Sequence, residues 1–289
     1  QIIFLLLITF NIISVATTIL VSHYIGSKNT EKLSTIYTLS VAINLVFSII
    51  ISLIVLLFSN QIFTFMSLPK EIFADAVTYM KLIGGLIFIQ GLNSAFSAIF
   101  RANKMMKENM IVSIIVNLIN LVFNAFLIYG IGPIPALGVA GAAIATIIGR
   151  IVGVILYIVI FNKKFEGRIS FKYLRPFPKA ELKKMLVVGV PSAGESLSYS
   201  FAMTIVSKIA NMLGIIFGIY VINTMVFARS FSWLSFLYAT AIGQAAQVVI
   251  GNHMGAGNVE KVNKVVMKTL RDSVLISIVV SLIMFIFSD

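Results

Sequence analysis

The chain has 289 residues, of which 59% are hydrophobic and only 11% are charged. Soluble domains carry about 45–50% apolar and about 25% charged residues, so one globule of this length could not bury such an apolar excess. The composition excludes an ordinary soluble domain, a disordered chain and a coiled coil, and it leaves a polytopic membrane protein. With no Cys and only two His, we expect no disulfide, no thiolate site and no histidine-built metal cluster.

Apolar runs of membrane-spanning length follow one another along the chain. A spanning helix needs about 20 apolar residues, and the runs are too long and too continuous for buried or barrel strands. They therefore predict eight helices, and we expect the last one, which looks short, to begin nearer Val262. The runs are 1–25, 36–58, 73–100, 110–129, 139–161, 185–213, 217–251 and 273–287.

The net charge of +12 is concentrated in alternate loops. The loops after the first, third, fifth and seventh runs hold two, three, eight and four Lys or Arg, whereas the other loops hold only Lys70. This alternation is the positive-inside pattern, which places the basic loops in the cytoplasm. Loops that bind RNA would not alternate, so we expect no nucleic-acid partner. The longest basic loop, 162–184, predicts a cytoplasmic linker between an N-terminal lobe, 1–161, and a C-terminal lobe, 185–289.

The sequence also matches itself at a shift of 229 residues. Residues 16–60 align with 245–289 without a gap, and twelve of the 45 positions are identical. The shared Gly, Asn, Glu and Lys of a short polar turn carry the signal, because hydrophobicity does not force them. Six runs separate the two copies, so both cross the membrane in the same direction, which predicts two six-helix bundles related by an axis along the membrane normal. We expect an all-α integral membrane protein with two lobes, incomplete at both ends.

Several segments resemble the multidrug and toxic compound extrusion (MATE) family of bacterial transporters. Residues 250–258, IGNHMGAGN, resemble the VGQ-x-LGAGN turn of that family, and 20–29 look like its counterpart in the first half. Residues 117–146 are similar to the family's helix 5, short loop and helix 6, and 189–196, GVPSAGES, resemble the opening of its helix 7. The resemblance covers essentially the whole chain, and it implies that helices 2–9 of twelve are present.

The family resemblance carries functional implications. It implies export of organic cations in exchange for Na⁺ or H⁺ as the coupling ion, with membrane lipids and a small organic substrate as partners and no other cofactor. It places the protein in the bacterial cytoplasmic (plasma) membrane as a multi-pass protein, which we expect to be a monomer when complete. Some members carry an Asp in helix 5 four residues after an Asn, whereas here the pair is Asn120 and Asn124.

Glu195 is the acid that lies deepest within an apolar run. It follows the cytoplasmic entry of its run by about ten residues, or about 15 Å at helical rise, so it lies near mid-bilayer. A charge there is costly and marks a functional candidate. Pro191, four residues earlier, removes a backbone hydrogen bond and predicts a hinge. Two interpretations stay open: Glu195 binds the coupling cation or substrate, or it forms a buried pair with Arg229 on the next run.

Further candidates are neutral, and each has an ordinary alternative. Mid-helix amides such as Gln90, Asn93 and Asn117 bind substrate or bridge helices, and Tyr199 and Met203 pack or line a cavity for flat cations. Arg150 either snorkels or contacts the other lobe, and Gly138 and Ala142 predict a close helix contact. The residues that we predict for cation coupling and substrate binding are Glu195, Arg229, Asn120, Asn124, Tyr199, Met203 and Asn223, with Pro191 as the hinge.

The function predicted from the sequence is multidrug efflux by a secondary antiporter whose two lobes alternate access. One alternative is a lipid-linked oligosaccharide flippase of the same broad architecture, which would need more cavity cations than Arg150 and Arg229. The other is a non-transporting membrane scaffold. The sequence contains no P-loop and no Ser/His/Asp set, so we expect neither ATP-driven pumping nor an enzymatic activity.

Overall fold

The computed structural model is helical, and no strand occurs in the part of the chain that it describes. It describes residues 2–65, 70–130, 135–165, 167–217 and 220–286. Within these ranges, the side chains of 2–9, 11, 65, 70–72, 193, 195–197, 200, 204, 207–208, 210–211, 213–217, 220–236 and 284 lie outside the description. The elements are α1 (Ile2–Gly26), α2 (Glu31–Phe65), α3 (Lys70–Gly85), α4 (Ile87–Ala102), α5 (Met106–Tyr129), α6 (Gly138–Lys164), the 3₁₀ turn η1 (Phe171–Leu174), α7 (Lys179–Phe217), α8 (Tyr220–Gly255) and α9 (Val259–Ile286).

The all-helical membrane fold predicted from composition is confirmed. Among the described residues, three helices are long and apolar enough to cross a membrane, namely Glu31–Thr64, Met106–Tyr129 and Gly138–Lys164. The helices Phe73–Gly85 and Ile87–Ala102 together form a fourth candidate, bent by 45°. Helix α9 begins at Val259, close to the start that we expected near Val262.

Contacts with α2 stabilise the bend between α3 and α4. Gly84 and Gly85 lie so close to α2 that a Cβ on Gly84 would stand 2.4 Å from Val55 Cγ1. The hydroxyl of Ser52 donates a hydrogen bond to the carbonyl oxygen of Gly85. Because a side chain of α2 satisfies this carbonyl, the helix can break at Leu86 without leaving a buried acceptor unpaired. The apolar run predicted over 73–100 is therefore a bent pair of helices.

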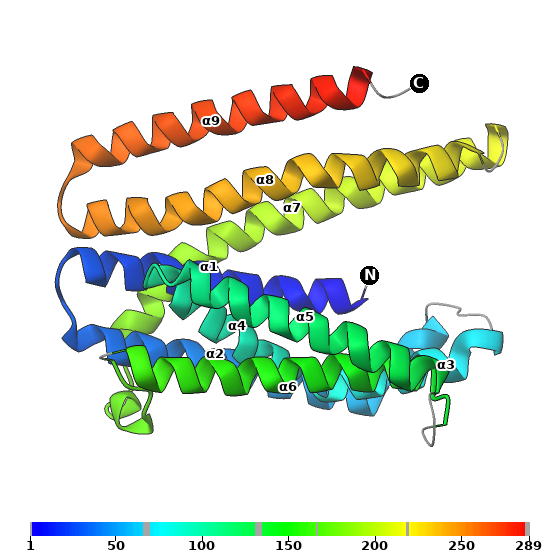
Figure 1. Ribbon diagram of the computed structural model, residues 1–289, viewed down its shortest axis with the longest axis horizontal. Coiled ribbons are helices and arrows are strands. Elements are labelled where there is room, and N and C mark those ends of the chain that lie inside the picture. The colour runs from blue at the N-terminus through cyan, green and yellow to red at the C-terminus, as the bar shows by residue number, and fades with distance from the viewer. Residues whose placement is uncertain (1, 66–69, 131–134, 166, 218–219, 287–289) are drawn as a thin grey trace. The chain divides into compact units, whose positions relative to one another are not determined.

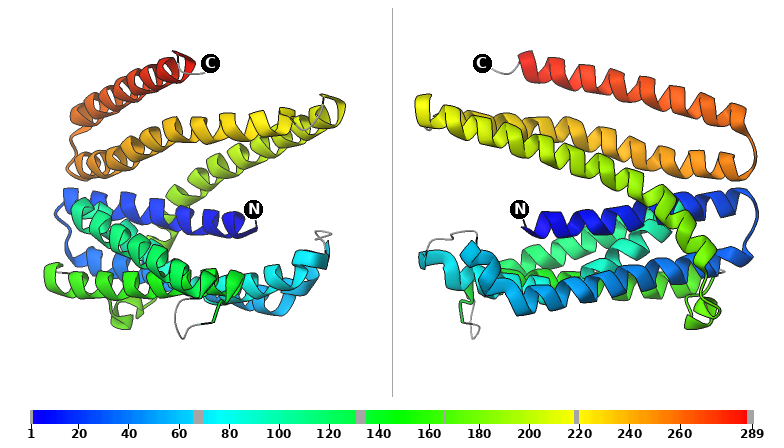
Figure 2. Two further views of the ribbon diagram at one scale, coloured as in Figure 1. Left: turned by 45° about the vertical axis from the view of Figure 1, so that its right-hand side comes forward. Right: turned by 180° about the vertical axis from the view of Figure 1, so that it is seen from behind.

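The chain folds into two compact units. The first unit comprises Gln1–Val21 and Thr30–Gly189, and the second comprises Ser22–Asn29 and Val190–Asp289. In the first unit α5 packs along α6, and α6 also packs against α3 and α4, which in turn pack against α2 (Figure 1). In the second unit α8 and α9 pack side by side and are joined by a tight turn (Figures 1 and 2).

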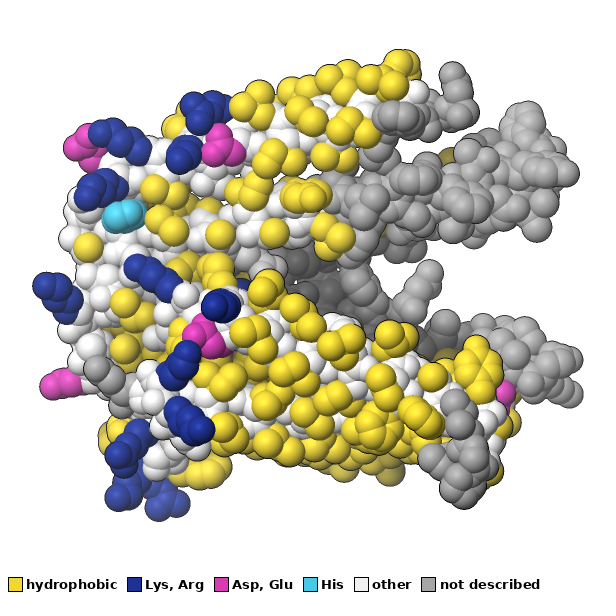
Figure 3. Space-filling model, viewed as in Figure 1, with side chains coloured by type: hydrophobic (Ala, Val, Ile, Leu, Met, Phe, Trp, Pro, Cys, Tyr) yellow, Lys and Arg dark blue, Asp and Glu magenta, His cyan; other side chains and the backbone are white. Residues whose placement is uncertain are grey.

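Small hydroxyl side chains pack α2 against its neighbours, beside large buried side chains of the same helix such as Tyr37 and Val55. The hydroxyls of Thr17 on α1 and Ser40 on α2 are 2.7 Å apart. A Cβ on Gly91 of α4 would lie 2.9 Å from Ser48 Oγ, so the two backbones approach closely at that level. Packing through small and hydroxyl residues is typical of helices that associate in lipid, where apolar burial gives no driving force. The outer face of α5 is apolar, with Leu121 67% exposed, as a lipid-facing surface requires (Figure 3).

The turns after α1 and α8 have the same hydrogen-bond pattern at positions separated by the repeat shift. Ser27, Lys28 and Asn29 donate their backbone N–H groups to the carbonyls of His23, Ile25 and Tyr24. The equivalent residues Ala256, Gly257 and Asn258 donate to Asn252, Met254 and His253. The repeat found in the sequence therefore corresponds to one backbone structure that occurs twice.

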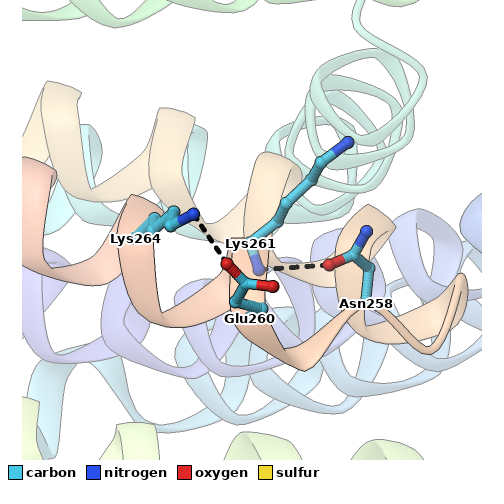
Figure 4. A network of polar contacts seen from close by, with 4 residues as sticks. All are labelled: Asn258, Glu260, Lys261 and Lys264. Carbon is cyan, nitrogen blue, oxygen red and sulfur yellow. Dashed lines mark hydrogen bonds and ion pairs between the residues drawn. The ribbon is translucent and has the colours of Figure 1, made fainter.

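These two turns also contact one another within the second unit, through equivalent glycines. A Cβ on Gly26 would lie 2.0 Å from the carbonyl oxygen of Asn252, and a Cβ on Gly255 would lie 2.0 Å from that of His23. His23 and Asn252 each lie three residues before the glycine of their own turn. Each glycine therefore contacts the equivalent residue of the other turn, and the contact is reciprocal, as in an isologous interface. Asn258 Oδ1 then accepts the N–H of Lys261 at 3.1 Å and caps α9, where Lys264 pairs with Glu260 at 2.7 Å (Figure 4).

Candidate functional site

Asn120 and Asn124 form a hydrogen-bonded pair between α5 and α6. Asn124 Nδ2 donates to Asn120 Oδ1 at 3.0 Å, and Asn120 Nδ2 donates to Thr146 Oγ1 at 3.1 Å. Thr146 donates its own proton to the carbonyl oxygen of Ala142 at 2.9 Å. Asn124 Oδ1 is buried and has no hydrogen-bond partner among the described residues. The pair thus bridges α5 and α6.

The other predicted residues lie on α7 and α8. The backbones of Glu195, Arg229 and Asn223 are helical, but their side chains lie outside the described residues. Tyr199 is 45% exposed and Met203 is partly buried. Pro191 lies inside α7, whose helical backbone continues through it.

A spacing of four residues connects the predicted positions on α7. Pro191, Glu195, Tyr199 and Met203 follow one another at this interval, which places them along one side of the helix. The predicted hinge Pro191 therefore occupies the same side of α7 as the positions of Glu195 and Tyr199.

A polar cavity, which we name the arginine cavity, lies inside the first unit between α1, α4, α5 and α6. Its volume is about 230 Å³, and two of its lining residues, Arg101 and Arg150, are basic. The described lining residues are Ser14, Gln90, Asn93, Ser94, Ser97, Arg101, Val112, Ser113, Val116, Asn117, Arg150 and Tyr157. The sequence indicated Gln90, Asn93, Asn117 and Arg150 as separate candidates. It did not predict that they line one cavity.

The lining of this cavity is fixed by hydrogen bonds. Arg101 Nη1 donates to Ser97 Oγ at 2.6 Å. Asn93 Nδ2 donates to the backbone oxygen of Arg150 at 2.9 Å and to that of Ile89 at 3.0 Å, so it joins α4 to α6. Gly153 makes room for this amide, since a Cβ there would lie 2.7 Å from Asn93 Oδ1. The spacing of Ser94, Ser97 and Arg101 along one side of α4 was the available sequence signal for this face.

Two carboxylates among the described residues pair with lysines near helix ends. Glu108 accepts from Lys164 at 2.7 Å, and Glu181 accepts from Lys32 at 3.0 Å. The hydrogen bond from Lys32 lowers the pKa of the Glu181 carboxyl below its usual value. No group of three or more His, Cys, Asp or Glu that could hold a metal ion occurs within the described part of the chain.

Comparisons with known proteins agree with this architecture. The MatE family profile matches residues 1–126 and 191–289. The chain is 33% identical over 288 residues to the uncharacterized transporter YisQ of Bacillus subtilis, covering 100% of this chain and 62% of YisQ. It is 30% identical over 280 residues to the probable multidrug resistance protein NorM of Thermotoga maritima, covering 96% of this chain and 58% of that protein. The chain therefore spans about three fifths of the length of these curated relatives.

A solved structure gives the same fold. A crystal structure of MATE in the bent conformation superposes with a TM-score of 0.89 at 23% sequence identity, covering 98% of this chain and 62% of that one. The family resemblance carried by the GAGN turn and by the segment from Asn117 to Thr146 is confirmed. The chain belongs to the MatE family of membrane transporters.

Proposed function

We propose that the full-length protein is a secondary antiporter that exports organic, cationic or amphiphilic compounds in exchange for Na⁺ or H⁺. The observation that carries this proposal is the family profile, which matches both halves of the chain, each with its own copy of the repeated turn. Two related halves support alternating access, in which one half moves against the other around a central site. The name of the Thermotoga maritima relative, a probable multidrug resistance protein, supports drug-like substrates.

Glu195 is the coupling residue in this proposal. Its carboxylate holds either the coupling cation or the positively charged substrate, and since one charge cannot pair fully with both, the two ligands compete. Arg229 favours the ionised form of that carboxylate. Tyr199, Met203 and Asn223 line the substrate path. Pro191 is the hinge of α7.

The pair of Asn120 and Asn124 supplies neutral contacts in the first unit. The buried oxygen of Asn124 that has no partner among the described residues supports such a role. We place the protein in the bacterial cytoplasmic membrane as a multi-pass monomer.

Transport of a fluorescent organic cation by the full-length protein in everted membrane vesicles tests the proposal. We expect uptake that depends on an imposed Na⁺ or proton gradient and that stops when the gradient is collapsed. A flippase or a scaffold would give no gradient-driven uptake. In that event, translocation of a lipid-linked sugar by the same vesicles would separate these two, and the antiporter proposal would be abandoned.

A further inference from the structure

We propose that the arginine cavity binds a small anion carrying a phosphate or carboxylate group, at a site separate from that for exported organic cations. The described lining residues include two guanidinium groups, Arg101 and Arg150, and none of them is a carboxylate. This charge is the opposite of what an organic cation requires. The site is therefore not an extension of the proposed efflux path.

The burial of the two arginines calls for a negative partner. Arg150 lies within α6, a candidate membrane span, Arg101 lies in the last turn of α4, and both are only partly exposed. A positive charge in such a place is costly unless an anion or a polar network compensates it. Within the described part of the chain, no carboxylate forms an ion pair with either guanidinium, because the four described ion pairs use other residues. An anion that enters the cavity would supply the missing charge.

The hydrogen-bonding capacity of the lining also favours an anion. A guanidinium has five N–H donors, and Ser97 accepts one hydrogen bond from Arg101. Asn117 uses Nδ2 to bond the carbonyl of Ser113 at 2.8 Å, which leaves its second amide hydrogen for a ligand. Tyr157 donates its proton to Asn109 Oδ1 at 2.6 Å. The forked guanidinium groups of the two arginines match carboxylate and phosphate oxygens.

The size of the cavity limits the ligand. Its volume of about 230 Å³ is below the range of about 300–1,000 Å³ that holds drug-sized molecules. Asn93 bonds to the backbone of Arg150, and Arg101 lies eight residues further along α4, or about 12 Å at helical rise. The two arginines therefore line the cavity at different levels of the bundle. A lipid phosphate headgroup and a soluble anion share this chemistry.

Thermal unfolding of the purified full-length protein in a neutral detergent tests the site and separates the two sources of anion. One arm titrates inorganic phosphate against sodium chloride of equal ionic strength. The other titrates short-chain phosphatidylglycerol against the matching diacylglycerol, which lacks phosphate. We expect a saturable rise of the unfolding temperature with phosphate if the ligand is soluble, and with phosphatidylglycerol alone if it is a lipid.

Variants of Arg101 and Arg150 test whether these residues cause the saturable rise of the unfolding temperature. Arg101→Gln and Arg150→Gln should each abolish the saturable rise, while Arg168→Gln, a change in the linker, should keep it. Arg150→Lys keeps the charge but loses the planar fork that bonds an anion through two N–H groups, and it should weaken binding of the anion. This variant also serves if Arg150→Gln does not fold.

Two results would overturn the proposal: no saturable rise with either anion in the wild type, or an equal rise in Arg150→Gln. Because the readout is binding, its failure would leave the proposed efflux untouched, and a failure of efflux would leave this site untouched.

Discussion

Lys28 and Gly257 occupy equivalent positions in the two repeated turns, and both have a positive φ, 58° and 72°. The left-handed region is open to glycine but costs other residues about 1 kcal/mol or more. Both turns nevertheless make the same three backbone hydrogen bonds. The first turn therefore bears a conformational cost that the second avoids, and the hydrogen bonds outweigh it.

Lys28→Gly should raise the free energy of unfolding of the full-length protein by about 1 kcal/mol, and Gly257→Ala should lower it by a similar amount. A Cβ on Gly257 meets nothing within 4 Å, so backbone strain is the only cause of the second effect. Denaturant unfolding in detergent measures both. Gly243→Ala, which also meets nothing within 4 Å but lies inside a helix, is the control and should be neutral or slightly stabilising. A loss of stability in Lys28→Gly would contradict the strain argument.

The contacts of single residues were only partly predictable. The interval between Asn120 and Asn124 gives their place on one helix face, and the structure adds a direct hydrogen bond between them. Their partner Thr146 lies 26 residues away from Asn120 on another helix, and no periodicity within one helix reports such a contact.

Close packing of α5 and α6 depends on glycines that a sequence pattern locates only approximately. A Cβ on Gly141 would lie 2.3 Å from the carbonyl oxygen of Leu127, and one on Gly149 would lie 3.0 Å from that of Val116. The expectation that Gly138 makes a close helix contact is wrong, because a Cβ there would meet nothing within 4 Å. Gly138 instead starts the helix with a φ of 52°, so its conformation, not its size, explains why glycine occurs there.

Gly141→Ala should therefore destabilise the full-length protein by about 1–3 kcal/mol, the usual cost of overpacking, because the obstacle is backbone that cannot rotate away. Thermal unfolding in detergent measures the loss, and Gly243→Ala again provides the matched control. Equal stability of the two variants would contradict the close approach of α5 and α6 at Gly141, where a Cβ would lie 2.3 Å from the carbonyl oxygen of Leu127.

The ion pair of Lys32 and Glu181 connects the start of α2 with the start of α7. The pKa of Glu181 is lowered in the folded state, chiefly by the hydrogen bond from Lys32. Its stabilising contribution is therefore present above the unfolded pKa of a glutamate, about 4.3, and is lost as the pH falls through the lower folded value. Lys32 is 43% exposed, so the contribution is small.

Hydrogen exchange of the amides in residues 167–184 should accelerate, after correction for intrinsic rates, as the pH is lowered from 6 to 3. In Glu181→Gln the backbone amides should exchange quickly at both pH values, because the neutral glutamine side chain cannot form an ion pair with Lys32 at either pH. Were the wild type to show the same protection at both ends of this range, the ion pair would not hold the linker.

The two copies of the repeated hairpin differ in the surroundings of one helix face. Asn44, Ser48 and Ser52 are buried in α2, whereas the equivalent Ser273, Ser277 and Ser281 line an open apolar groove on α9. In the first copy this face packs against α3 and α4, which follow α2 in the chain. The serine positions that pack between helices in the first copy therefore line a groove in the second.

For the whole chain, composition and hydropathy predicted the helical membrane class, and the resemblance of residues 20–29, 117–146, 189–196 and 250–258 to known segments indicated the family. The arginine cavity could not be predicted, because its lining comes from four helices that are distant in sequence. The end of an apolar run at Phe100 predicts a loop position for Arg101, although this residue lies in the last turn of α4. Side-chain groups that face one cavity from several helices become visible only once those helices are packed.

The most direct test of the proposed antiport is gradient-driven export by the full-length Glu195→Gln protein beside the wild type and Glu260→Gln. Glu260 undergoes the same chemical change, but its side chain is 81% exposed at the start of α9. Counter-transport of a fluorescent organic cation would be recorded in vesicles over a range of pH and Na⁺ concentration. We predict that Glu195→Gln loses cation-coupled export while Glu260→Gln keeps it. Export by Glu195→Gln with unchanged pH and Na⁺ dependence would contradict the assignment of Glu195 as the coupling residue.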